Sequence, residues 1–218
     1  MSETTNFFAH GSRWVRADFH LHTRRDREFK DSGDEQDFVT RYVAALKQAD
    51  IRVGVITNHN KFDLSEFKAL RKAARKENIH LMPGVELSVK DGRNGIHTLV
   101  VFHEDWIDNR EQADHINSFL GVAFAGQTGY DNRNARSNHD LLETIRELDK
   151  FEKDYLLIFA HVEADNGLWG GLDGGRITEL GRNDLFRFRP AAFQNERAHD
   201  LLAHSHSLVG RWCRSQVV

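Results

Sequence analysis

The sequence predicts an α/β fold in which helices pack around a parallel β-sheet. Apolar stretches typical of strands alternate with amphipathic stretches typical of helices, which is the pattern of repeated strand–helix–strand units. The chain has 218 residues, of which 39% are hydrophobic and 29% are charged, so it can bury a substantial core. Histidine and carboxylate side chains follow several of the predicted strands, and in barrels of this class the chemistry lies at the carboxyl ends of the strands.

The predicted strands and helices follow from hydrophobic periodicity along the first two thirds of the chain. Strands are assigned where apolar residues alternate or run together, and helices where they recur every three or four positions. Pro83 and Gly84 interrupt one extended stretch, and Lys90 to Gly95 read as a hairpin-like turn. Strands are predicted over 14–20, 52–57, 79–82, 85–89, 96–103 and 155–160, and helices over 35–48, 64–76, 109–119 and 138–150.

The remaining segments carry weaker patterns. Residues 1–13 are polar and are expected to form a flexible arm, and 121–136 are expected to form a long loop. Five glycines between Asn166 and Gly175 predict a mobile loop, which begins an irregular tail over 166–218. Because no composition shift or repeat divides the chain, we expect one metal-binding domain over 1–218.

Composition and charge exclude several classes of protein. The net charge of −3 predicts no bulk attraction to nucleic acid or to a membrane surface. No apolar run approaches the roughly 20 residues that a membrane-spanning helix needs. Cys213 is the only cysteine, so no internal disulfide can form, and the reducing cytoplasm is the expected location.

The first predicted strand carries the strongest functional signal. Val15, Ala17, Phe19 and Leu21 alternate with Asp18, His20 and His22. Side chains two residues apart point to one face of a strand, so His20 and His22 should aim at the same space. Two imidazoles on one rigid face are half of a transition-metal site, although such a pair can also be an ordinary core or surface feature.

Four further candidates stand near predicted strand ends. His59 and His161 follow their strands directly, Glu86 comes after Pro83-Gly84-Val85, and His97 opens its strand. Histidine with carboxylate suits zinc, manganese or iron, and a glutamate among histidines can bridge two ions. Paired ions can hold a bridging hydroxide and polarise a phosphoryl oxygen, which requires no side-chain nucleophile. The sequence offers no serine in a nucleophile elbow, and Cys213 lies near the terminus.

Five motifs occur in an order that resembles the PHP (polymerase and histidinol phosphatase) family. They are Asp18-x-His20-x-His22-Thr23, Ile56-Thr57-Asn58-His59-Asn60, Gly84-Val85-Glu86, Ile96-His97-x-Leu99 and Ala160-His161. The resemblance implies a distorted (β/α)7 TIM-like barrel, either complete or truncated at its carboxyl end. It also implies two or three divalent ions held by His20, His22, His59, Glu86, His97 and His161. The second and fourth motifs look most similar to PHP domains fused to ATPases of the SMC or AAA type.

The chain departs from the family pattern at three places. Asn58 stands where the family usually has aspartate, and a further ligand after the first motif has Asp26 and then Asp31 as candidates. The family's final Asp-x-His motif is missing, and His204-Ser205-His206 is the nearest substitute. Imidazole brings no negative charge, so we expect tight metal binding at His20 and His22 and weak binding where the final motif would contribute.

The resemblance predicts a metal-dependent phosphoesterase that hydrolyses phosphomonoesters or phosphodiesters, such as nucleotides or the ends of DNA or RNA. A catalytically impaired metal-binding regulatory domain of a larger ATPase-type protein is the alternative, because the final motif is missing. A third possibility, a C–N hydrolase, lacks a clear base. Arg24 and Arg25 follow the first strand and are predicted to contact substrate phosphate, although a solvated loop explains them equally well. His103 competes with His97 for the site, and the motif favours His97.

Overall fold

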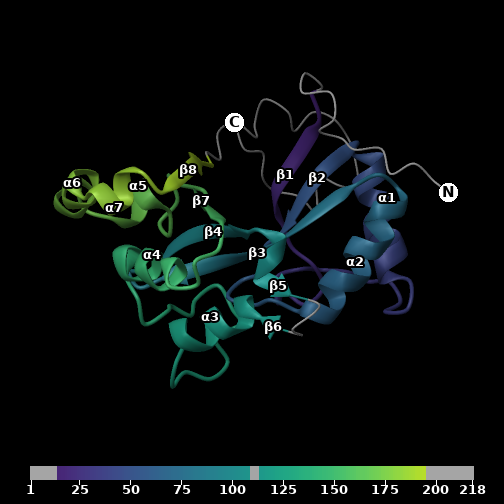
Figure 1. The fold of residues 1–218 in the computed structure, drawn as a ribbon, viewed down its shortest axis with the longest axis horizontal. Coiled ribbons are helices and arrows are strands. Elements are labelled where there is room, and N and C mark those ends of the chain that lie inside the picture. The colour runs from purple at the N-terminus through teal and green to yellow at the C-terminus, as the bar shows by residue number, and fades with distance from the viewer. Residues whose placement is uncertain (1–13, 109–112, 195–218) are drawn as a thin grey trace.

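A computed structural model describes residues 14–108 and 113–194, and these residues form a mixed α/β fold built on one strongly curled sheet (Figure 1). The sheet has six strands in the order β1-β2-β3-β4-β7-β8, and a separate pair is formed by β5 and β6. The strands are β1 (Arg16–Leu21), β2 (Ile51–Ile56), β3 (His80–Val89), β4 (Ile96–Phe102), β5 (Ile107–Asp108), β6 (Ala113–Asp114), β7 (Tyr155–Phe159) and β8 (Pro190–Phe193).

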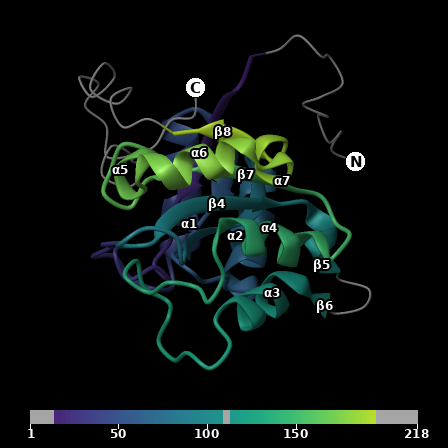
Figure 2. The same cartoon turned by 90° about the vertical axis from the view of Figure 1, so that its left-hand side faces the viewer.

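Helices connect most of these strands. The α1 and α2 helices lie together beside β1–β3, α3 and α4 lie under β4, and α5, α6 and α7 form a separate group next to β8 (Figures 1 and 2). They are α1 (Phe38–Gln48), α2 (Leu64–Lys76), α3 (His115–Ala123), α4 (Leu141–Asp149), α5 (Leu168–Gly171), α6 (Gly174–Arg182) and α7 (Asp184–Arg187), with a 3-10 turn, η1, at Glu104–Trp106.

The sheet is parallel only in part, which corrects the prediction. The first three strands run parallel, and β7 is parallel to β8, but β4 is antiparallel to both β3 and β7. Helices α1 and α2 provide the crossovers that parallel strands require, whereas the 90–95 turn is too short for one. The hairpin-like turn predicted at 90–95 therefore indicated correctly that β3 and β4 are antiparallel, which an all-parallel barrel does not allow.

The β3 strand pairs with different neighbours along its length. His80 to Pro83 pair with β2, and Gly84 to Val89 pair with β4. Pro83 has no backbone N–H to donate to a neighbouring strand. A Cβ on Gly84 would lie 2.6 Å from Val55 Cγ1, so glycine allows β2 to approach closely. Both residues therefore suit the point where β3 changes its partner. The two predicted strands 79–82 and 85–89 are thus one bent strand, and Glu86 lies just past the bend.

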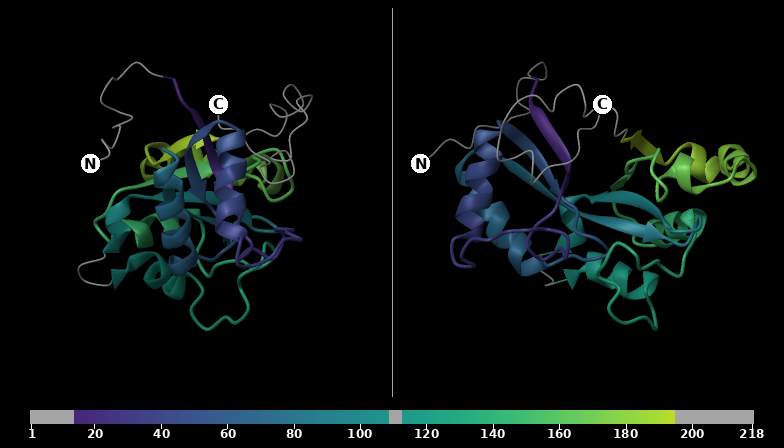
Figure 3. Two further views of the ribbon diagram at one scale, coloured as in Figure 1. Left: turned by 90° about the vertical axis from the view of Figure 1, so that its right-hand side faces the viewer. Right: turned by 180° about the vertical axis from the view of Figure 1, so that it is seen from behind.

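The two faces of the sheet bury different cores. Alternate residues such as Val85, Leu87 and Val100 pack under the helices in the larger core. The opposite, concave face carries a small core of Val55, Leu99, Val101, Ile158 and Ala160. The concave face also curls far enough for β1 to contact β4, which is not its sheet neighbour (Figure 3). Glu86 and His97 share this face with Leu99, because Glu86 is paired with Leu99 and His97 lies two residues before it.

The segment expected to be a mobile loop and irregular tail is ordered as far as Gln194. Residues 168–193 form α5, α6, α7 and β8. The glycines serve close packing, because a Cβ at Gly167 or Gly170 would collide with backbone atoms of residues 161–164. The predicted 1–13 arm, Cys213 and His204-Ser205-His206 lie outside the described residues.

The seven-stranded barrel is not present in the described part of the chain, where β1 and β8 are the two edges of a six-stranded sheet. Most predicted boundaries are close to the observed ones, and the 64–76 helix matches α2. The predicted 109–119 helix begins later, at His115. Within residues 14–108 and 113–194, no helix has the length and apolar character needed to cross a bilayer.

Candidate metal centre

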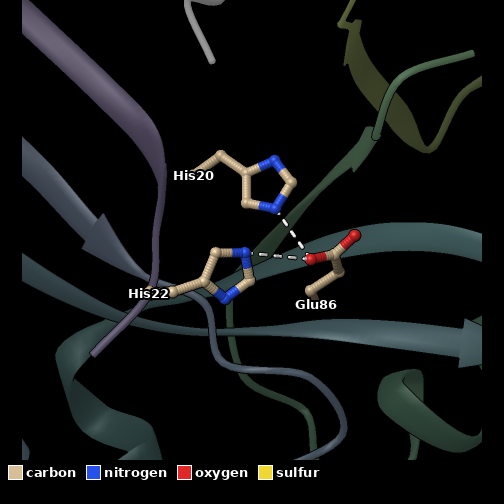
Figure 4. Close-up of side chains that lie close together, drawn as sticks. All are labelled: His20, His22 and Glu86. Atoms are coloured by element: carbon tan, nitrogen blue, oxygen red, sulfur yellow. Dashed lines mark hydrogen bonds and ion pairs between the residues drawn. The ribbon is translucent and has the colours of Figure 1, made fainter. Parts of the chain in front are cut away.

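Strand ends bring the candidate histidines to one side of the curled sheet. His20 is on β1, and His22 follows its last residue; His59 follows β2, and His161 follows β7. His97 is near the start of β4, which runs in the opposite direction and so presents its amino end at the same place. All five imidazoles surround Glu86 on β3, and Figure 4 shows His20, His22 and this carboxylate pointing toward one another.

The two oxygens of Glu86 divide the imidazoles into two groups. Oε2 lies 2.7 Å from His20 Nε2, 3.3 Å from His22 Nε2 and 3.1 Å from His59 Nε2. Oε1 lies 2.7 Å from His97 Nδ1 and 3.2 Å from His161 Nε2. The carboxylate is only 1% exposed. The sequence-predicted site residues therefore form one buried cluster with Glu86 at its centre.

The donor set fits metal ions better than it fits hydrogen bonding alone. Three imidazole nitrogens converge on Oε2, which has two lone pairs and cannot accept a good hydrogen bond from each. His161 Nδ1 is buried and has no hydrogen-bond partner among the residues that the structure describes. A cation among these groups would accept lone pairs from several imidazoles at once and neutralise the buried carboxylate. Within the described residues, His20/His22/Glu86, His22/Asp26/His59 and His59/Glu86/His97 each place ligand atoms within 4.8 Å of one another.

Asp26 is a second buried carboxylate behind His22 and His59. Its Oδ2 lies 3.0 Å from His22 Nδ1 and 2.8 Å from His59 Nδ1, and it also accepts the His59 backbone N–H at 2.7 Å. The sequence had made Asp26 a candidate for a further ligand, ahead of Asp31, which instead pairs with Arg41 at 2.6 Å. Asp26 therefore belongs to the cluster.

Electrostatics in the cluster favour positive charge between the two carboxylates. Burial alone would lower the pKa of His22, but its hydrogen bonds to Asp26 and Glu86 outweigh burial and raise that pKa from 6.5 to about 10. Burial alone would raise the pKa of Glu86, yet the charge of His20 and the imidazole hydrogen bonds hold it well below its usual range. The pKa of Asp26 is also held low, because contacts with His22 and His59 outweigh its burial.

Asn58, which departs from the family pattern, joins the ends of β1 and β2. Its side-chain oxygen accepts the Thr23 N–H at 2.8 Å, and its amide donates to Thr23 Oγ1 at 2.9 Å. Thr23 Oγ1 in turn donates to the buried carboxylate of Glu66. An aspartate at position 58 could not donate to Thr23, so asparagine suits the chain of hydrogen bonds from position 58 through Thr23 to Glu66.

A loop from the second half of the chain covers one side of the cluster. Asn60, at a positive φ of 51°, donates to the carbonyls of Tyr130, Asn132 and Ala135. The Arg133 carbonyl lies 3.2 Å from His97 Nε2. The predicted 121–136 loop is thus attached to the cluster through backbone acceptors that a sequence pattern cannot reveal.

Gln194 is a functional candidate that the sequence analysis missed. It follows β8, is 2% exposed, and its Oε1 lies 3.1 Å from His20 Nδ1 and 3.3 Å from the backbone nitrogen of His161. A glutamine after an apolar strand carries no distinctive signal, and β8 itself was not predicted. The amide lies at the carboxyl end of the last described strand, whereas the predicted substitute for Asp-x-His, His204-Ser205-His206, lies outside the described residues.

Other candidates lie away from Glu86. Arg24 pairs with Glu35 at 2.8 Å and with Glu66 at 3.1 Å, and Arg25 pairs with Asp63 at 3.2 Å. Both guanidinium groups are paired with carboxylates, and their predicted contacts with substrate phosphate stay a prediction. His103 is half exposed and contacts Asp105, whereas His97 is in the cluster.

No protein-family model matches the chain, and no curated protein is significantly similar to it. Solved structures that align with part of the chain include the following three. A candidate metal-dependent phosphoesterase from Bifidobacterium adolescentis is 11% identical with a TM-score of 0.48, over 76% of this chain and 73% of that one. An amidohydrolase from Chromobacterium violaceum with bound sulfate and no metal is 15% identical with a TM-score of 0.44, over 76% and 72%. PsfC from Pseudomonas syringae is 15% identical with a TM-score of 0.45, over 82% and 63%.

Proposed function

We propose that this protein is a metal-dependent phosphoesterase whose ions are held by His20, His22, His59, Glu86, His97 and His161. The convergence of five imidazoles on the two oxygens of one buried glutamate carries the proposal. Zinc, manganese or iron would suit this set of nitrogen and carboxylate ligands. Such ions would act as Lewis acids that polarise a phosphoryl oxygen and lower the pKa of water.

The chain's own residues would bind and orient the ions without supplying a nucleophile. Glu86 faces two groups of imidazoles through its two oxygens, so it would bridge two ions. Asp26 accepts from His22 and His59 on their Nδ1 side, which leaves the Nε2 atoms of both rings toward Glu86. Buried carboxylate partners of this kind orient metal-binding imidazoles and make them better ligands.

Charge balance limits how many ions bind tightly. Within the part of the chain that the structure describes, Glu86 and Asp26 are the buried carboxylates that contact the imidazoles, and together they would neutralise one divalent ion. Gln194 stands at the end of β8 as a neutral amide. A second ion would keep an uncompensated positive charge until an anionic substrate arrives. We therefore expect one tight position and one weaker position whose affinity rises when phosphate binds.

Three cations on neighbouring loops suit an anionic substrate. Arg27 is adjacent to Asp26, Lys61 is two residues after His59, and the carbonyl of Arg133 contacts His97. Arg27 and Lys61 share Asp131 at 2.8 and 3.4 Å, and Arg133 pairs with Glu28 at 2.9 Å. Each side chain is at least 36% exposed, so a phosphate ester, including a nucleotide or the end of a nucleic acid, can reach them.

A regulatory metal-binding domain, which would serve a larger ATPase-type protein, is the second candidate. The neutral Gln194 at the end of β8 favours it, because a missing carboxylate weakens a second ion and with it catalysis. This alternative predicts one bound ion and no turnover.

Metal content measured together with phosphoesterase activity separates the two candidates. The purified protein would be dialysed to equilibrium against buffer that contains zinc or manganese, so that the weaker position stays occupied, and assayed with bis-p-nitrophenyl phosphate, p-nitrophenyl phosphate and nucleotides. Two ions with metal-dependent turnover support the phosphoesterase. One ion without turnover on any substrate contradicts it and supports the regulatory domain.

The His103→Ala variant is the matched control for these measurements. His103 directly follows the strand that carries His97, but it is exposed and outside the cluster. It should keep the metal content and the rate of the parent protein, whereas His97→Ala should lower both.

A further inference from the structure

Gln194 lies where it can orient imidazoles on both sides of Glu86. Its side-chain oxygen contacts the ring of His20, which faces Oε2, and the backbone of His161, whose ring faces Oε1. Gln194 is also held by its backbone, because its N–H donates to the Phe159 carbonyl at 2.8 Å and its carbonyl accepts from Val162 at 3.0 Å. A side chain so placed can act on metal binding without touching an ion.

The contact with His161 fixes which end of the amide faces the cluster. A backbone N–H can only donate, so the atom 3.3 Å from the His161 nitrogen must be the amide oxygen. The same oxygen lies 3.1 Å from His20 Nδ1. His20 Nδ1 must then carry a proton in order to donate to it, and the tautomer of this ring follows from the hydrogen bonds alone.

The opposite nitrogen of His20 is consequently the one available for a ligand bond. His20 Nε2 lies 2.7 Å from Glu86 Oε2. Without a metal ion, a proton on this nitrogen can donate to the carboxylate; a bound ion would replace that proton and accept the Nε2 lone pair. The tautomer set by Gln194 therefore presents His20 as a metal ligand through Nε2.

The backbone of His161 is strained at the position that Gln194 contacts. Its φ is +28°, a region that residues with a side chain rarely adopt. The His161 N–H donates to Gln194, and its carbonyl accepts from Ala164 at 2.8 Å. Hydrogen bonds on both backbone groups hold this conformation, which keeps His161 Nε2 3.2 Å from Glu86 Oε1.

We propose that Gln194 is a positioning residue of the metal centre: it holds the proton of His20 on Nδ1 and supports the backbone of His161. This inference rests on the proposed metal centre, but it concerns the orientation and the tautomer of the ligands and not the reaction. Outer partners of metal-binding histidines typically contribute a factor of about 10 to 100 in metal affinity. Gln194 should contribute in this range to the affinity for zinc.

The test combines zinc affinity with the tautomer of His20. Zinc affinity would be measured by competition with a chromophoric chelator, for the parent protein, Gln194→Leu, Gln194→Glu and Gln127→Leu. Gln127 is the control, because it also makes two hydrogen bonds, to the Arg136 carbonyl and to Asn138, but none to the cluster. Ring-nitrogen NMR of histidine-labelled protein, assigned with His20→Ala, would report the tautomer with and without zinc.

Gln194→Leu should bind zinc about 10- to 100-fold more weakly and should lose the Nδ1-protonated state of His20 as the dominant form. Gln194→Glu keeps an acceptor at this position, so it should keep the tautomer and bind zinc at least as tightly. Gln127→Leu should match the parent protein in both measurements.

The inference is overturned if Gln194→Leu matches the affinity of the parent protein, or if Nδ1 of His20 carries no proton in the parent protein. The second reading needs no variant, so it decides the matter even if Gln194→Leu does not fold. Zinc binding without phosphoester hydrolysis would overturn the proposed function while the affinity ratios still support this inference. Hydrolysis with unchanged affinity in Gln194→Leu would overturn this inference alone.

Discussion

The imidazoles on the two sides of Glu86 differ in their other hydrogen-bond partners. On the Oε2 side, His22 and His59 are backed by the buried carboxylate of Asp26. On the Oε1 side, His97 is backed by neutral groups, the Arg133 carbonyl and the Asn166 amide. Attraction between a dication and a buried anion is strong, whereas neutral groups contribute only dipoles. The same carboxylate can therefore serve two positions of unequal affinity, and the Oε2 side should be the tighter one.

The largest effect is expected from Glu86→Gln. This variant removes the ligand that both metal positions share, so the difference in metal affinity between the Oε2 and Oε1 sides should disappear. Glutamine keeps the size of the side chain but brings no charge, so neither side should retain an ion through dialysis. Metal content would be measured by mass spectrometry, and the fold by circular dichroism. Glu104→Gln, at an exposed carboxylate, is the control. Parent-level metal content or activity in Glu86→Gln would mean that Glu86 is not a bridge.

Paired histidine variants should show which side binds more tightly. His20→Ala combined with His22→Ala should remove the ion that survives dialysis, together with any activity. His97→Ala combined with His161→Ala should retain that ion and lose only the weaker one. The measurement is zinc stoichiometry at rising chelator concentration. The opposite order of loss would show that the Oε1 side is the tighter position.

Asp26→Asn should reduce the difference in zinc affinity between the Oε2 side and the Oε1 side of Glu86. Asparagine can still accept a hydrogen bond from His22 or His59, but the charge behind these rings is gone. Zinc affinity at the tight position should fall by about 10- to 100-fold, and the weaker position should change little. Calorimetric titration resolves the two steps. Asp31→Asn, at a carboxylate paired with Arg41, is the matched control and should leave both steps unchanged. Equal weakening of both steps would contradict the assigned role.

The smallest effect is expected from the cations around the cluster. Lys61→Met removes one exposed charge near the substrate, which contributes about 1 kcal/mol or less, so KM should rise by up to about fivefold. Zinc affinity and kcat should not change, because Lys61 pairs with Asp131 and not with any histidine of the cluster. Lys68→Met, on α2, is the control. A loss of metal in Lys61→Met would show that the residue supports the cluster and not the substrate.

The six predicted ligand candidates could be found from sequence because they occupy strand ends or alternate along strands. Local periodicity places such residues on one face, and the parallel half brings His20, His22 and His59 together. His97 could not be placed by that rule, because β4 runs in the opposite direction and its amino end is at the site. Only the motif order favoured it over His103.

The second half of the fold could be predicted less well, for physical reasons. Gly167 and Gly170 indicated a mobile loop, but here glycine is required by close backbone packing, which depends on segments distant in sequence. The support from Gln194 and the Arg133 carbonyl arises from tertiary contacts across 174 and 36 positions, respectively, with His20 and His97. Amides and backbone carbonyls occur everywhere in a sequence, so such partners have no local signature.

The change of neighbours along β3 also bears on the order in which the chain can fold. Glu86 and His97 lie on a hairpin whose ladder runs from Gly84↔Val101 to Val89↔Ile96, so local contacts bring them together. His161 arrives only when β7 pairs with β4, as in Thr98↔Phe159, which requires closure of a much longer loop. Loop closure of this length is entropically costly and slow. The cluster should thus begin as a carboxylate and one imidazole on a hairpin, and His161 should join it among the last steps of folding.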